Sequence, residues 1–147
     1  MLLSTAGIAQ DDTRVDDPWA IGFNLHKIGF RSPFYVGHEN IRVGYWFHRY
    51  HHAGVEFGTL RTNIVSPIVG PYYRFQALDG KIHPFFEGSA KILFTRTTAL
   101  ERARSFVGGG YVGVNIELSD RFSIEAAFGR STIDWDQYMG LSYRFGG

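Results

Sequence analysis

The stretch "YMGLSYRF", residues 138–145, alternates large apolar side chains with small and polar ones. One face of the extended chain carries Met139, Leu141, Tyr143 and Phe145, and the other carries Gly140, Ser142 and Arg144. Because successive side chains of a strand point to opposite sides, the stretch is predicted to be a β-strand with one apolar face. Such a face has to be removed from water, either by a protein core or by lipid.

The composition favours a sheet and restricts the function. The chain has 147 residues, which suits one domain, with 16% aromatic residues, 18 glycines and a formal net charge of +1. A near-neutral chain has no basic field for nucleic acid. The absence of cysteine excludes disulfides and thiolate chemistry. No apolar run reaches the ~18 residues of a membrane helix, which leaves a transmembrane barrel open because its strands alternate.

The same two-residue period recurs along the whole chain from Trp19 onward. About eight strands of roughly 9 to 13 residues are expected, near the length of a tilted strand that crosses a bilayer. The segments that carry the period are 19–26, 40–50, 53–61, 68–78, 81–94, 109–118, 121–129 and 138–145. We therefore predict an all-β, eight-stranded antiparallel up-and-down barrel.

The predicted connections alternate in length. Tight turns are expected at "HHAG" (51–54), "LDGK" (78–81) and "LSDR" (118–121), and Asp79-Gly80 is a strong hairpin signal. Longer, more polar connections are expected around 31–38, 61–67, 95–105 and 130–137. An even number of strands with short turns at one end and longer loops at the other is the layout of an outer-membrane barrel.

Alternation alone also fits a soluble, lipocalin-like barrel, in which the apolar face points inward. The apolar faces here carry too many aromatic rings for the narrow interior of eight strands. These rings are Trp19, Phe23, Tyr45, Phe47, Phe57, Tyr73, Phe75, Phe86, Phe94, Phe122, Phe128, Tyr143 and Phe145. We predict that they face lipid, with Trp19, Tyr45 and Tyr143 in interfacial belts.

The opposite faces carry small residues and balanced charges, which are predicted to fill the barrel. The cations are Arg42, Arg74, Lys91 and Arg144, and the carboxylates are Glu56, Glu87, Glu117 and Glu125. A closed interior requires such balance because an unpaired buried charge costs several kcal/mol. An interior ion-pair network, rather than an open pore, is therefore expected.

The last strand resembles the terminal signal of bacterial outer-membrane proteins, carried here by Tyr138, Gly140, Tyr143 and Phe145. Over residues 18–145 the chain is similar to the small eight-stranded barrels that include the transmembrane domain of OmpA and OmpX. It departs from them in Gly146-Gly147, which follow the usual terminal Phe. The resemblance implies an outer-membrane location, contact with membrane lipid and lipopolysaccharide, and reading of the last strand by the barrel-assembly machinery. It implies almost nothing about activity.

The N-terminal residues are predicted to lie outside the barrel. Residues 1–9 contain apolar and small residues, and Gly7-Ile8-Ala9 resembles a small-x-small cleavage site, so the segment is interpreted as the remnant of an export signal. Residues 10–17 form a polar lead-in, and the barrel domain occupies 18–147.

Candidates for chemistry are few, and no cofactor or metal is expected. On one strand, His83, Glu87 and Ser89 are too far apart to form a hydrolytic triad. We therefore expect a non-enzymatic protein, structural or interacting through its loops, and the alternative is a lipid A-modifying enzyme.

Two further groups of polar residues have simple explanations. The close histidines His48, His51 and His52 are consistent with a metal site, but solvated turn histidines are the favoured interpretation. The segment "TALERAR" carries Glu101, Arg102 and Arg104, which are suited to lipopolysaccharide phosphates but are equally ordinary exposed charges.

Overall fold

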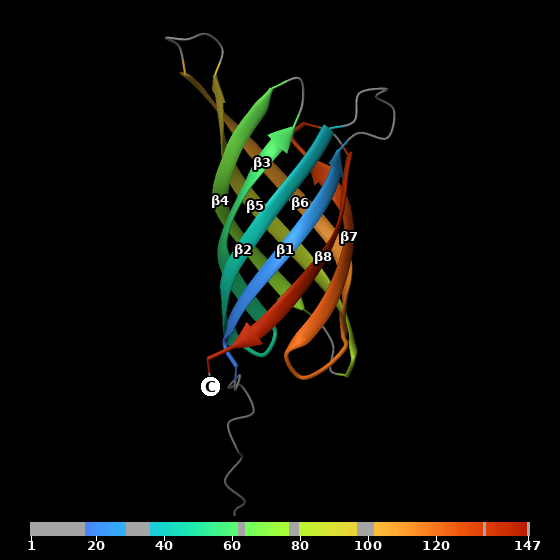
Figure 1. The fold of residues 1–147 in the computed structure, drawn as a ribbon. Helices are drawn as coiled ribbons and strands as arrows, with labels where there is room; N and C mark the ends of the chain where they lie inside the picture. The colour runs from blue at the N-terminus through green and yellow to red at the C-terminus, as the bar shows by residue number, and fades with distance from the viewer. Residues whose placement is uncertain are drawn as a thin grey trace, which may run out of the picture.

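The chain forms a closed antiparallel barrel in which eight strands follow one another in chain order (Figure 1). The computed structural model describes residues 17–28, 36–61, 64–76, 80–96, 102–133 and 135–146. The strands are β1 (Trp19–Ile28), β2 (Val36–His48), β3 (His51–Arg61), β4 (Val65–Gln76), β5 (Ile82–Arg96), β6 (Arg102–Glu117), β7 (Phe122–Ser131) and β8 (Trp135–Phe145). The last strand pairs with the first, from Trp19 opposite Phe145 to Ile28 opposite Asp136, so that no strand is left with an unpaired edge.

Burial alternates along the strands as the sequence predicts. On β7 the residues Ser123, Glu125 and Ala127 are buried, whereas Phe122 and Ile124 are exposed. The same distribution holds on the other strands, so the barrel has a polar interior and an apolar exterior. This is the reverse of a soluble barrel and is the arrangement of transmembrane barrels. The predicted fold class and the predicted facing of the strands are confirmed.

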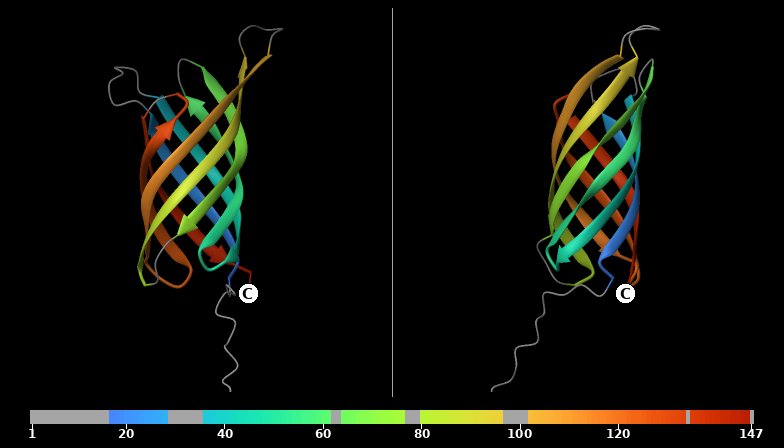
Figure 2. Two further views of the ribbon diagram at one scale, coloured as in Figure 1. Left: turned by 180° about the vertical axis from the view of Figure 1, so that it is seen from behind. Right: turned by 90° about the vertical axis from the view of Figure 1, so that its left-hand side faces the viewer.

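The two ends of the barrel differ (Figures 1 and 2). The turns at 49–50 and 118–121 lie at the end where β1 begins and β8 finishes, and Trp46 there donates a backbone hydrogen bond to Pro18. This is called the turn end below. The opposite end, where β7 connects to β8, is called the loop end. The long strands β5 and β6, of 15 and 16 residues, extend furthest at the loop end (Figure 2).

Four of the predicted connections are wrong. The turn between β2 and β3 lies at 49–50, and the "HHAG" segment belongs to β3, where His51 pairs with His48 across a bulge. The connections expected at 61–67, 95–105 and 130–137 are mostly strand, because β4 begins at Val65, β6 at Arg102 and β8 at Trp135.

The turn at 118–121 is where it was expected. Of "LDGK" only Gly80 and Lys81 are described, and Gly80 has a φ of 113°, which explains glycine there. The export-signal remnant at 1–9 and almost all of the lead-in at 10–17 lie outside the described residues, as does most of 31–38. Within the described residues, no helix is long and apolar enough to cross a membrane.

Candidate functional site: the charged lumen

Six charged side chains from five strands converge inside the barrel. Each is at most 5% exposed. They are the cations Arg42 (β2), Arg74 (β4) and Lys91 (β5), and the carboxylates Glu56 (β3), Glu87 (β5) and Glu125 (β7). Three positive and three negative charges leave the set neutral, as a buried ionic group must be to persist in a low-dielectric interior. We call these six residues the lumen network.

Glu87 is the central carboxylate of the lumen network. It receives a bidentate pair of hydrogen bonds from Arg42, Nη1 to Oε2 at 2.9 Å and Nη2 to Oε1 at 2.8 Å. Arg74 donates to the same Oε2 from Nη2 at 2.7 Å and from Nε at 3.0 Å. Charge-assisted bidentate contacts of this kind are both strong and directional. They fix the positions of both guanidinium groups.

The network reaches from one wall of the barrel to the other. Arg74 on β4 donates to Glu125 on β7 at 2.5 Å, and Arg42 on β2 lies 3.6 Å from the same carboxylate. Arg42 also donates to Glu56 on the neighbouring strand at 3.2 Å. Strands that are not neighbours in the sheet are thus joined through the middle of the lumen.

An aromatic side chain completes this layer. Tyr138 is 2% exposed, and its hydroxyl donates to Glu87 at 3.1 Å and accepts from Arg74 at 3.2 Å. Arg42 lies over the Tyr138 ring, 4.8 Å from its centre, and Arg74 lies 4.0 Å from the centre of the Phe85 ring. Each of the two guanidinium groups therefore lies over an aromatic ring, which favours the buried cations.

A second polar branch extends from the network toward the loop end. The Lys91 ammonium lies 2.6 Å from Glu56, and Asn40 donates to the other oxygen of Glu56 at 2.8 Å. The Asn40 amide nitrogen also lies 3.0 Å from Nε2 of His26. Because the amide is a donor, His26 accepts at Nε2 and carries its proton on Nδ1.

The branch ends in a buried aspartate. Asp136 is 1% exposed and accepts from His26 Nδ1 at 3.1 Å and from the Tyr111 hydroxyl at 2.7 Å. The His38 ring is tilted against that of His26, with their centres 4.5 Å apart. These contacts satisfy the hydrogen-bonding capacity of the Asp136 carboxylate without another cation. They extend the packed interior from the lumen network toward the loop end.

Two of the eight residues predicted for the interior network lie elsewhere. Arg144 and Glu117 form their own pair at 2.6 Å near the turn end, with side chains 27% and 25% exposed. His83 joins this pair at 3.3 Å from Glu117. The remaining six are the lumen network.

Sequence reasoning did not identify several lumen residues. Alternation placed Asn24, His26 and Tyr111 on the inner face, but their hydrogen-bonding roles carried no recognisable motif. Asp136 fell in a predicted connection and was missed altogether. Tyr138 was assigned only to the terminal signal. The two-residue alternation, continued to the strand ends, was the available signal that would have placed Asp136 and Tyr138 on the inner face.

The histidine interpretation is wrong for His52, which is 5% exposed and stacks on Trp46 inside the barrel with ring centres 4.7 Å apart. Its neighbour His51 points outward, and its Nδ1 lies 2.6 Å from the Tyr73 hydroxyl. Among the described residues no group of three or more His, Asp or Glu side chains is arranged to hold a metal ion. The carboxylate considered for a triad, Glu87, is bound by arginines.

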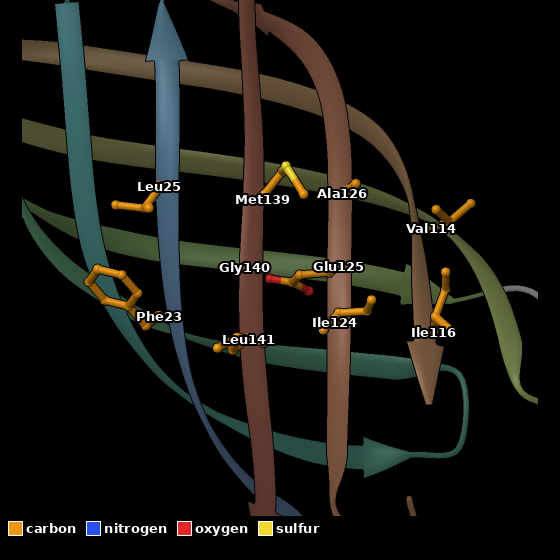
Figure 3. Close-up of a pocket in the computed structure, with 10 residues that line it drawn as sticks. All are labelled: Phe23, Leu25, Val114, Ile116, Ile124, Glu125, Ala126, Met139, Gly140 and Leu141. Carbon is orange, nitrogen blue, oxygen red and sulfur yellow. The ribbon is translucent and has the colours of Figure 1, made fainter. Parts of the chain in front are cut away.

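The exterior carries shallow apolar grooves between bulky side chains. Figure 3 shows one of about 320 Å³ on the wall formed by β6, β7, β8 and β1. Phe23, Leu25, Met139 and Leu141 flank it, and the small outward side chain of Ala126 leaves it open. Gly140 also lines this groove through its backbone, but it is the interior that requires glycine there, because a Cβ would lie 1.8 Å from the Asn24 side chain.

No protein-family model and no curated protein matches the chain. Solved structures do. The outer membrane protein H (OprH) of Pseudomonas aeruginosa matches with a TM-score of 0.68 at 15% identity, over 87% of this chain and 99% of that one. Neisserial surface protein A (NspA) matches with a TM-score of 0.67 at 10% identity, over 86% and 96%. The N-terminal β-barrel domain of P. aeruginosa OprF matches with a TM-score of 0.66 at 8% identity, over 86% and 97%.

The chain therefore has the fold of the small eight-stranded transmembrane β-barrels, as its resemblance to them implied. At these identities the similarity establishes the fold and not a shared activity.

Proposed function

We propose that this chain is an integral outer-membrane protein whose barrel is closed by the lumen network and whose role is non-enzymatic. The observation that carries the proposal is the bidentate pair between Arg42 on β2 and Glu87 on β5, together with the contacts from Arg74 to Glu87 and Glu125. Eight strands leave an interior only wide enough for side chains, and here charged and aromatic groups occupy it.

The exterior supports a membrane location on physical grounds. Phe23 is 45% exposed, Phe57 53% and Phe86 60%, and other large apolar residues surround them on every strand. In water so large an apolar surface would drive aggregation, whereas in lipid it is the favoured state. Trp19 packs edge-on against Tyr45 with ring centres 5.1 Å apart at the turn end, which suits an interfacial belt.

The way the polar groups are used supports a non-enzymatic role. The best candidate for acid–base chemistry is the His26–Asp136 pair, but both side chains are enclosed and are committed to Asn40 and Tyr111. A nucleophile would have to lie within hydrogen-bond reach of the base. The groups that hold the interior together therefore serve packing and ion pairing.

The protein's interactions are assigned to its outer surface. In the layout of bacterial barrels, the end with longer connections faces the cell exterior and the short turns face the periplasm. We assign the loop end to contacts with lipopolysaccharide or a protein partner. The terminal strand, with Tyr138, Gly140, Tyr143 and Phe145, is assigned to recognition by the barrel-assembly machinery.

The proposal is tested on protein refolded into detergent micelles and on cells. A heat-modifiable shift in gel migration is expected for a folded barrel, and detergent removal is expected to precipitate it. A protein that stays monomeric in water without detergent would instead be a soluble barrel. Mass spectrometry of lipid A from cells with and without the protein is expected to give identical acyl patterns. A changed pattern would identify a lipid A-modifying enzyme and contradict the proposal.

A further inference from the structure

A second exterior groove, of about 640 Å³, crosses the wall from β4 to β8. Its central row consists of residues that lie opposite one another in register from strand to strand. The row is Tyr73, Gly88, Gly110, Arg130 and Trp135. All five line the groove.

One side of the groove is a wall of bulky side chains. Phe75, Phe86, Val112 and Phe128 form the adjacent outward row, again in register from β4 to β7. Phe128 in turn stacks on Trp135 with ring centres 5.2 Å apart. Gly88 and Gly110 have no side chain, so backbone forms the floor of the groove there, beside the apolar wall.

The protein itself does not require glycine at these two positions. A Cβ built on Gly88 or Gly110 meets no atom within 4 Å, and neither residue has a positive φ. By contrast, a Cβ on the neighbouring Gly129 would lie 2.1 Å from the Gly110 carbonyl oxygen. Glycine inside a strand is unfavourable and marks a bulge, a bend or a close approach to the backbone. The open floor is therefore consistent with a bound group outside the barrel.

A cation lies at one end of the groove. Arg130 is exposed on the apolar exterior near the loop end of β7, and its guanidinium lies 5.6 Å from the centre of the Trp135 ring. Arginine binds phosphate with two parallel hydrogen bonds, and an aromatic ring holds it in place while it does so. Tryptophan is also the residue that prefers the headgroup region of a bilayer.

The dimensions suit one hydrocarbon chain. From Tyr73 to Trp135 the row crosses four strand-to-strand steps of about 4.8 Å each, or about 19 Å in all. Because the strands tilt, the row is inclined to the membrane normal and spans roughly one leaflet of a hydrocarbon core about 30 Å thick. An acyl chain that starts at Arg130 would follow Gly110 and Gly88 toward the membrane centre.

We propose that this groove binds one acyl chain of a lipid that carries a phosphomonoester, with that phosphate held by Arg130. The inference rests on the proposed membrane location and orientation, which place Arg130 in the outer leaflet. The lipid of that leaflet is lipid A, which is acylated and carries phosphomonoesters. A phosphomonoester has a charge of about −1.5 to −2 and three acceptor oxygens, so it pairs with arginine better than a phosphodiester does. The groove of Figure 3 has only apolar side chains on its outward face and is not assigned a headgroup.

The test uses heat-modifiable, folded protein in detergent micelles and native mass spectrometry with added lipid A. The wild-type protein is expected to retain one lipid A. Arg130→Gln should weaken retention about tenfold, because a charge-assisted bidentate contact is lost. Gly110→Leu should weaken it to a similar extent by filling the groove, and Arg61→Gln should leave it unchanged. Arg61 is also a cation at the loop end, but it is already paired with Glu39 at 2.8 Å.

Three results would overturn the proposal. The first is equal retention of lipid A by the wild type and both groove variants. The second is equal retention of lipid A and phosphatidylglycerol by the wild type. The third is a protein dimer that Gly110→Leu dissociates, because it would assign the groove to a second copy of the chain. Because only heat-modifiable protein enters the assay, failure to form a barrel would count against the proposed function and not against the groove.

Discussion

Arg42 on β2 and Glu87 on β5 form a bidentate ion pair through the middle of the barrel, with N–O distances of 2.9 and 2.8 Å. Their strands are not neighbours in the sheet, so the pair braces the barrel across its lumen rather than along its wall. Because Arg74 binds the same carboxylate at 2.7 Å, one side chain supports two cations. Glu87 is therefore the residue whose loss should affect the barrel most.

Glu87→Gln is expected to lower the free energy of unfolding by about 3–5 kcal/mol, because it leaves buried guanidinium groups short of a counter-charge. The measurement is denaturant unfolding in micelles, followed by heat-modifiable gel migration. Glu39→Gln is the matched control. Its pair with Arg61 is exposed, with side chains 58% and 40% accessible for Arg61 and Glu39, and is expected to contribute about 0–1 kcal/mol. Equal effects of the two variants would show that the lumen network does not stabilise the barrel.

Tyr138→Phe keeps the ring beneath Arg42 but removes the hydroxyl that donates to Glu87 at 3.1 Å. A loss of about 1–3 kcal/mol in unfolding free energy is expected, since buried partners lose a hydrogen bond. Tyr143→Phe controls for the chemistry of the change on an outward-facing ring, and a change below about 0.5 kcal/mol is expected for it. An undisturbed Tyr138→Phe barrel would mean that the hydroxyl is dispensable to the network.

Alanine substitutions at two glycines compare a crowded site with an open one. Gly140→Ala would put a Cβ 1.8 Å from Asn24 and is expected to destabilise the barrel by at least about 1–3 kcal/mol. Gly88→Ala meets no atom within 4 Å and is expected to be neutral or to stabilise by up to about 1 kcal/mol. Thermal unfolding of the two variants in the same detergent measures the difference. Destabilisation by Gly88→Ala would contradict the open groove floor.

Phe145→Ala tests the assembly signal. Phe145 is 39% exposed, so removing its ring should lower the free energy of unfolding by only a few kcal/mol. If the barrel-assembly machinery reads this residue, the amount of protein reaching the membrane in cells should fall far more than the stability of refolded protein. The control is Arg144→Ala, which removes a partly exposed pair with Glu117 and is expected to reduce stability slightly without blocking insertion. Normal insertion of Phe145→Ala would contradict the signal.

The sequence predicted the barrel and its facing because one physical constraint acts on every strand. Lipid on one side and a packed polar lumen on the other force a two-residue period, which is visible at Phe122, Ile124, Ser123 and Glu125 without any knowledge of the partners. Where the apolar alternation stops, the sequence no longer predicts a strand. The strand ends at Arg102 and Trp135 lie beyond the apolar pattern and were assigned to loops.

The lumen was predictable in composition but not in pairing. Alternation placed Arg42, Arg74 and Glu87 inside, but which groups meet depends on the stagger of the strands around the barrel, and no short motif encodes it. This is why Arg144 and Glu117 were grouped with the others, although they pair separately near the turn end. It also explains why the contact between His26 and Asp136, 110 residues apart, had no sequence signal.

The proposal that side chains close this barrel is tested by single-channel recording on wild-type protein in planar bilayers. Refolded, heat-modifiable protein is added at a concentration at which a known porin gives stable conductance steps. A quiet baseline is expected, because Arg42, Arg74, Glu87 and Tyr138 fill the lumen. Large, stable, porin-like conductance steps from the same preparation would contradict it.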